Sequence, residues 1–135
     1  LTVPRLGRER SDKQYRMNSI GRSGARLAFG SDWPVSSGAP LDGIAVALSR
    51  QTSDGEPPGG WPPDEVLSVD QALTAYTAAV AEQAFADHEA APWGRLEPGA
   101  VADPVWLERD PHSVAPQEVP ALRVRATYLA GRRVY

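Results

Sequence analysis

The sequence contains no cysteine, one methionine and only two histidines in 135 residues. The absence of cysteine excludes disulfides and cysteine-ligated zinc sites, and it leaves the redox compartment undetermined. Neither His88, after a long predicted helix, nor His112, in the run Asp-Pro-His, has a partner at metal-ligand spacing, so we expect both on surface loops. A catalytic metal needs about three protein ligands, and these two histidines do not supply them.

The chain also lacks long apolar runs and a strong excess of charge. No apolar run approaches the roughly 20 residues of a membrane span, so we expect no membrane partner and a cytoplasmic location. The net charge is −3, which argues against nucleic acid as the main partner. Basic residues gather in residues 1–26, seven against two acidic ones. This excess predicts a solvated, salt-bridged surface, with an anion site as the alternative.

Residues 25–35, Ala-Arg-Leu-Ala-Phe-Gly-Ser-Asp-Trp-Pro-Val, are the stretch around which the rest is organised. A short apolar run bounded by Gly and Pro predicts a buried strand over residues 27–30. Asp32 follows that strand, and α/β enzymes keep their chemistry at the carboxyl ends of parallel strands. Asp32 is therefore a candidate catalytic carboxylate, or alternatively a cap or turn former. Trp33 is a candidate wall of a substrate pocket, or a residue of loop packing.

Apolar spacing predicts two clear helices with a loop between them. A helix over residues 40–48 has Pro in its first turn and an apolar stripe at Leu41, Ile44, Ala45 and Leu48. The Gly- and Pro-rich residues 52–63 predict a long loop, fastened by Trp61. Ser68-Val69-Asp70-Gln71 is a capping box and predicts a helix from Val69 to about Phe85. A weaker pattern indicates a further helix within residues 12–24.

The last third of the chain changes to a pattern typical of antiparallel sheet. Leu96-Glu97-Pro98-Gly99 predicts a tight turn. Residues 101–107 and 122–129 read as strands, and residues 133–135 begin a partner strand after a turn at Gly131. Pro104 cannot donate to a ladder, so it must lie at an edge, a strand start or a bulge.

Several runs of the sequence match motifs of one known family. They are Gly-Ser-Asp-Trp-Pro at 30–34 followed by Pro-Leu-Asp-Gly-Ile at 40–44, and Ala-Leu-Thr-Ala-Tyr-Thr at 72–77. Residues 93–103 carry Gly-x-Leu-x-Pro-Gly-x-x-Ala-Asp, and residues 124–135 end in Gly-Arg-x-Val-Tyr. In this order, the runs resemble the C-terminal portion of the YtcJ-like amidohydrolases, which belong to the metal-dependent amidohydrolase superfamily.

The resemblance implies an α/β fold made of the last strand and helices of a (β/α)8 TIM-type barrel, with C-terminal strands of a small β-sandwich. Residues 1–95 would be the barrel part and residues 96–135 the sandwich part. The family hydrolyses an amide or related C–N bond of a small molecule with metal-activated water, and zinc is the expected divalent ion. Asp32 corresponds to the carboxylate after the eighth strand, which lies beside the metal and takes the proton from the attacking water.

The sequence departs from the family pattern in its metal ligands. A (β/α)8 barrel needs about 200 residues or more, and the His-x-His of the first strand and the later ligands are absent. We therefore expect a C-terminal fragment that is inactive and binds no metal alone, with Asp32 a metal ligand only beside a missing barrel segment. The alternative is a non-catalytic fragment or remnant that self-associates through exposed strand edges.

Overall fold

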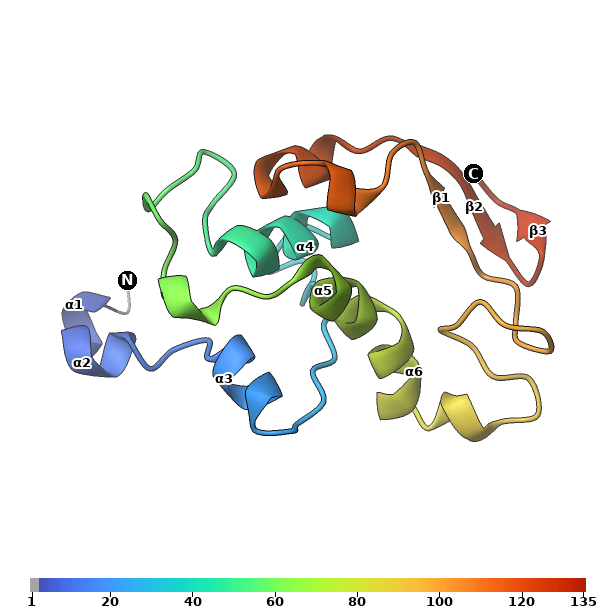
Figure 1. Cartoon of the computed structure of the whole chain (residues 1–135), viewed down its shortest axis with the longest axis horizontal. Helices are drawn as coiled ribbons and strands as arrows, with labels where there is room; N and C mark the ends of the chain where they lie inside the picture. The colour runs from blue at the N-terminus through green and yellow to red at the C-terminus, as the bar shows by residue number, and fades with distance from the viewer. Residues whose placement is uncertain (1–2) are drawn as a thin grey trace.

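The computed structural model describes residues 3–135, which form helices and a small antiparallel sheet (Figure 1). Two short helices begin the described chain, and the sheet closes it at the opposite end of the molecule. Between them lie the helices α4 and α5, which both contribute buried residues to the core. The elements are α1 (Val3–Leu6), α2 (Arg8–Ser11), α3 (Met17–Arg22), α4 (Pro40–Ser49), η1 (Pro63–Glu65), α5 (Val69–Tyr76), α6 (Ala78–Gln83), η2 (Ala86–His88), β1 (Val105–Leu107), η3 (Pro111–Ser113), η4 (Pro116–Ala121), β2 (Val124–Leu129) and β3 (Arg132–Arg133).

The core forms where α4 packs between α5 and the 3-10 helix η4. Ile44 and Ala47 of α4 and Ala72 of α5 are buried there, together with Val119 of η4 and Leu122 directly after it. Val119 is fully inaccessible to solvent. Residues nearly eighty positions apart therefore close one apolar centre, and the C-terminal part of the chain belongs to it.

Helix α4 confirms the predicted helix over residues 40–48. Pro40 occupies the first turn, where its missing N–H costs nothing. Ile44 and Ala45 of the predicted stripe are buried, and Leu41 and Leu48 pack partly against the core. The helix ends at Arg50, whose N–H donates to the carbonyl of Val46 at 2.7 Å.

The predicted single helix from Val69 to Phe85 is wrong, because the structure divides it into α5 and α6 at Thr77. The Thr77 hydroxyl donates to the carbonyl of Leu73 at 2.8 Å, a contact that competes with the helical ladder. Beyond the break Ala79 and Ala81 are buried, whereas Ala84, within the predicted helix, is exposed.

The break at Thr77 also leaves a backbone carbonyl free to bind residues 27–30. The carbonyl of Ala75, free of its helical partner, accepts a hydrogen bond from the N–H of Phe29 at 2.8 Å. Within residues 3–135 this is the one backbone hydrogen bond of residues 27–30. The predicted strand over residues 27–30 is therefore wrong for this structure, since no strand of the described chain lies beside it to form a ladder.

The sheet has the order β1-β2-β3 and is antiparallel throughout, as the sequence predicts. Pro104 directly precedes β1, an edge strand, and its carbonyl accepts from the N–H of Tyr128 at 3.0 Å. Ala130 and Gly131, both at positive φ, reverse the chain between β2 and β3 in the manner of a two-residue hairpin. The turn at Glu97–Ala100 is present as predicted, with the N–H of Ala100 donating to Glu97 at 3.1 Å.

Candidate functional site

Asp32 lies in an irregular turn after residues 27–30, and its side chain is exposed. Its φ is 54°, a left-handed conformation that Asp tolerates better than most residues. Its carbonyl accepts from the N–H of Val35 at 2.8 Å, which closes the turn. The carboxylate makes no hydrogen bond or ion pair with any residue that the structure describes, so it is free to accept a proton or a cation.

Trp33 lies beside Asp32 but folds over its own loop. A β-carbon on Gly38 would lie 3.4 Å from Cδ1 of the Trp33 indole, so the ring covers that glycine. Trp33 is 73% exposed. Trp33 therefore takes part in loop packing here, and a role in substrate binding stays a prediction.

A hollow of about 450 Å³ begins at the two residues before Asp32. Gly30 and Ser31 form one wall, and helix α4 forms another through Asp42 and Gly43. The hollow contains aromatic rings from distant parts of the chain; Phe29 and Tyr76 meet edge to face with ring centroids 5.7 Å apart. Its remaining lining residues are Tyr15, Met17, Ser36, Ser37, Val46, Ala47 and Arg50.

Gly43 and Tyr76 make the close contact that shapes this hollow. The phenol oxygen of Tyr76 occupies the space that a β-carbon on Gly43 would take. Glycine inside a helix costs about 1 kcal/mol relative to alanine, and the close approach of the ring explains why it is present. Burial raises the pKa of the Tyr76 hydroxyl, so this group stays a neutral hydrogen-bonding group at physiological pH.

Arg50 is the charged residue buried at the far end of α4. It is 9% exposed, and its Nε has no hydrogen-bond partner among residues 3–135. The guanidinium carbon lies 5.8 Å from the centroid of the Tyr15 ring, within the range of a cation–π contact. Burial lowers the pKa of Arg50, against the opposing effect of Glu65 and Tyr15.

Arg50 also has an unusual backbone conformation. It caps α4 at φ 57° and ψ 29°, the left-handed region where helices usually place glycine. A side chain in this conformation costs about 1–2 kcal/mol. The Arg50 carbonyl accepts from the N–H of Trp61 at 2.9 Å, and the Trp61 ring meets Tyr15 edge to face. These contacts confirm that Trp61 fastens the long loop, and they fix Arg50 from both sides.

Glu65 is buried near Arg50 and is held by helix α3. Its carboxylate accepts from the backbone N–H of Ser19 at 2.8 Å and from the Ser19 hydroxyl, and the Nε of Arg16 lies 3.9 Å away. Burial raises the pKa of Glu65, but the Ser19 hydrogen bonds and the charge of Arg16 outweigh it and hold the pKa below its usual range. Glu65 is thus a charged, fully engaged structural group.

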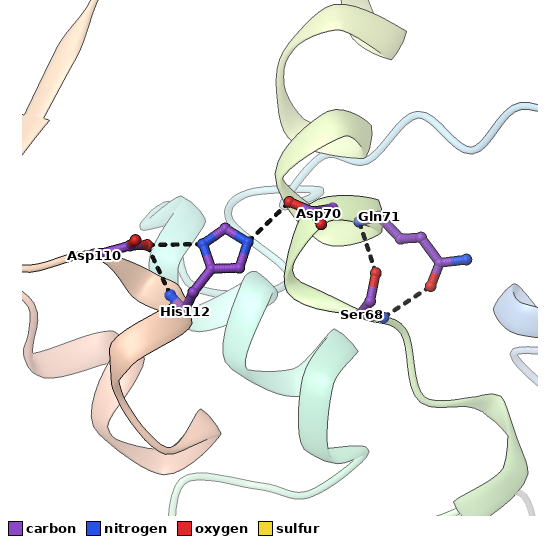
Figure 2. A network of polar contacts seen from close by, with 5 residues as sticks. All are labelled: Ser68, Asp70, Gln71, Asp110 and His112. Atoms are coloured by element: carbon purple, nitrogen blue, oxygen red, sulfur yellow. Dashed lines mark hydrogen bonds and ion pairs between the residues drawn. The ribbon is translucent and has the colours of Figure 1, made fainter.

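His112 forms a second polar network, which links η3 to the start of α5 (Figure 2). Its Nε2 lies 2.8 Å from Asp70 and its Nδ1 lies 2.7 Å from Asp110. Hydrogen bonds to these two carboxylates raise the pKa of His112. The backbone N–H of His112, 2.9 Å from Asp110 Oδ1, and then the His112 ring lower the pKa of Asp110. The figure also shows the capping box, in which Ser68 and Gln71 exchange hydrogen bonds.

Both histidines are exposed, as the sequence predicts, but they lie in the short 3-10 helices η2 and η3 and not in the expected loops. The His88 side chain is 85% exposed, and that of His112 is 45% exposed. The contact between His112 and Asp70, across forty-two positions, was not predicted. No local sequence signal indicates it, because its two ends come from separate elements.

A metal centre needs a set of donors that converge. Within residues 3–135, no group of three or more His, Cys, Asp or Glu residues could hold a metal ion. Asp32 is exposed and belongs to no such group among the described residues. The donor set of the described chain therefore does not fit a metal by itself, and Asp32 offers a single carboxylate.

The chain belongs to the Amidohydrolase family, whose pattern matches residues 1–135. Members of this family act on small molecules and generally depend on a metal. The family match confirms the resemblance to YtcJ-like amidohydrolases. The match supports hydrolysis of C–N bonds as the chemistry of the family, and it fits a superfamily of TIM-barrel proteins.

Curated relatives cover nearly the whole chain. It is 38% identical over 132 residues to the protein LONG AFTER FAR-RED 3 of Arabidopsis thaliana, covering 97% of this chain and 22% of that protein. It is 32% identical to an N-substituted formamide deformylase of Arthrobacter pascens (88% and 21%). It is 28% identical to the putative amidohydrolase YtcJ of Bacillus subtilis strain 168 (98% and 25%).

The chain thus spans about a fifth to a quarter of the length of these relatives. No solved structure matches it. Within the described residues, no helix combines the length and the apolar character needed to cross a membrane.

Proposed function

We propose that this chain is the C-terminal part of a metal-dependent amidohydrolase that cleaves an amide or related C–N bond of a small molecule. The family match over residues 1–135 is the observation that carries the proposal. In the whole enzyme, residues 1–95 would complete a (β/α)8 barrel and residues 96–135 would complete a small β-sandwich. The enzyme would act in the cytoplasm.

Asp32 is the catalytic residue of this proposal. Its carboxylate is exposed and unengaged among the described residues, so it can come within hydrogen-bond reach of a water molecule. It would accept the proton of the attacking water and deliver it to the leaving nitrogen. Trp33, the next residue, would line the substrate pocket once a barrel segment closes over this turn.

The proposed cofactor is a divalent metal ion, with zinc the expected one, which activates water when bound. Asp32 would be its one ligand from this chain, and the other ligands would come from a barrel segment outside it. The described residues alone form no such site, so the isolated chain would be inactive. The N-substituted formamides named for the Arthrobacter relative are the first substrates to try.

The test uses the protein encoded by the full reading frame around this chain. We expect that frame to carry His-x-His and further histidines upstream, and its product to hydrolyse an N-substituted formamide or another amide. Asp32→Asn should lower kcat about 10²- to 10⁴-fold, the usual contribution of a general base. Asp12→Asn, at another exposed aspartate, is the matched control. Normal activity of the Asp32 variant would refute the assignment.

A second candidate function is self-association as a non-catalytic module. Large apolar side chains are exposed on the sheet, including Val105 and Trp106 of β1 and Leu129 of β2. Strand β1 lies at a sheet edge, and an unpaired edge can add a strand from another copy. Sedimentation of the isolated chain tests this: a concentration-dependent dimer would support the module, and a monomer at all concentrations would exclude it.

A further inference from the structure

We infer that the hollow along α4 is a binding site for a small organic carboxylate. Its carboxylate group would be met by Arg50, and its apolar body would lie among the rings of Tyr15, Phe29 and Tyr76. This site goes beyond the proposed hydrolysis and does not depend on Asp32, which is not among the residues that line the hollow.

The first observation is the state of Arg50. Arg50 is only 9% exposed, yet it forms no ion pair with any residue of the described chain. Its Nε is both buried and without a hydrogen-bond partner. A buried charge without a partner is costly, and proteins normally satisfy it. The Nη groups of Arg50 also make no hydrogen bond to any described residue, and Arg50 lines the hollow, so its guanidinium is a ready partner for an anion.

The nearest acidic residue does not remove this need. Glu65 faces Arg50, but its oxygens accept hydrogen bonds from Ser19 and pair with Arg16. No hydrogen bond or salt bridge joins Glu65 to Arg50 within residues 3–135. The guanidinium of Arg50 thus keeps donors for a bound anion.

The shape and lining of the hollow indicate an organic anion. Its volume of about 450 Å³ lies within the usual range for small-molecule pockets, roughly 300–1,000 Å³. Aromatic rings and aliphatic groups form most of the wall, and the hydroxyls of Ser31, Ser36 and Ser37 add a few polar points. This combination suits a ligand with an apolar body and one charged end better than a bare inorganic anion.

Asp42 limits the ligand to one negative charge. It lines the same hollow from the first turn of α4, eight residues before Arg50. At 1.5 Å per residue, the two backbone positions are about 12 Å apart along the helix. A second anionic group at the Asp42 end would meet like charge, so the site favours a monocarboxylate.

The test is titration of the 135-residue chain with benzoate, followed by calorimetry and by the NMR signal of the Arg50 Nε–H group. We expect saturable binding and a shift of that signal. Arg50→Gln should weaken binding by tenfold or more, as the loss of a charge-assisted hydrogen bond predicts. Arg123→Gln, at an exposed arginine without an ion pair among the described residues, should leave binding unchanged.

Two further probes separate the alternatives. Benzyl alcohol, with the same ring and no charge, should bind at least tenfold more weakly than benzoate; equal binding would overturn the role of Arg50. Inorganic phosphate should likewise bind more weakly, and equal binding would overturn the assignment of an organic ligand. If Arg50→Gln does not fold by circular dichroism, the wild-type signal decides: an Nε–H resonance unmoved at saturating benzoate would refute the site.

Discussion

The Tyr76 hydroxyl rests on Gly43, in the space that a side chain at this helix position would require. The contact joins α5 to α4 and forms one wall of the hollow. It also reverses the usual effect of a glycine in a helix, because here the missing side chain makes room for a ring.

Gly43→Ala should therefore destabilise the protein, although alanine is the better helix former. The new methyl group would displace the Tyr76 ring, and such overpacking typically costs 1–3 kcal/mol, more than the gain of about 1 kcal/mol in propensity. Urea unfolding measures the difference. Gly21→Ala in α3 is the matched control, since its β-carbon would lie 3.5 Å from Leu27, an ordinary contact. A more stable Gly43 variant would contradict the packing described.

The bridge of His112 to Asp70 and Asp110 should make stability depend on pH. The pKa of His112 is raised in the folded state. The contribution of His112 to the stability of the fold is therefore complete below its unfolded pKa, about 6.5. This contribution is lost as the pH rises through the folded pKa. The lowered pKa of Asp110 acts oppositely: its contribution is present above about pH 3.9 and is lost as pH falls through the folded value.

The measurement is the urea midpoint of wild type and of His112→Gln at pH 5.5 and pH 8.5. We expect wild type to be more stable than the variant at the lower pH, and the difference to shrink at the higher pH. His88→Gln serves as the control, since that side chain is 85% exposed and approaches only Asp87 among the described residues. An equal loss of pH dependence in both variants would refute the bridge.

Removal of the capping box at the start of α5 should cost about 1 kcal/mol. Ser68→Ala deletes the acceptor of the Gln71 N–H, which lies 3.2 Å from the hydroxyl. Thermal unfolding would show a lower midpoint for this variant. Ser53→Ala, in the exposed loop before η1, should leave the midpoint unchanged.

Metal removal should not affect the isolated chain. With no group of three potential ligands in residues 3–135, we expect the same thermal midpoint with and without a chelator, and no stoichiometric zinc binding by calorimetry. Zinc bound at one equivalent, together with hydrolysis of an amide, would contradict the proposal that the other ligands come from elsewhere.

The sequence predicts best what depends on neighbours along the chain. The capping box at Ser68, the turn before Ala100, the helix begun by Pro40 and the hairpin at Gly131 are all confirmed. Each is set by a few consecutive residues with strong conformational preferences.

What the sequence does not predict depends on distant partners. The break at Thr77 follows from two hydrogen bonds. The Thr77 hydroxyl donates to the Leu73 carbonyl, and the N–H of Phe29 donates to the Ala75 carbonyl. Residues 27–30 have the composition of a strand, but a strand needs another strand beside it. Likewise, nothing along the sequence distinguishes Arg50 from a surface arginine, because its neighbours Tyr15 and Glu65 come from distant parts of the chain.

The burial of Val119 against α4 has a consequence for biosynthesis. While the chain emerges from the ribosome, α4 and α5 are released long before η4, and their apolar faces stay uncovered until residue 122 is free. A premature stop codon between α5 and Val119 would therefore leave the face of α4 that η4 covers exposed to solvent.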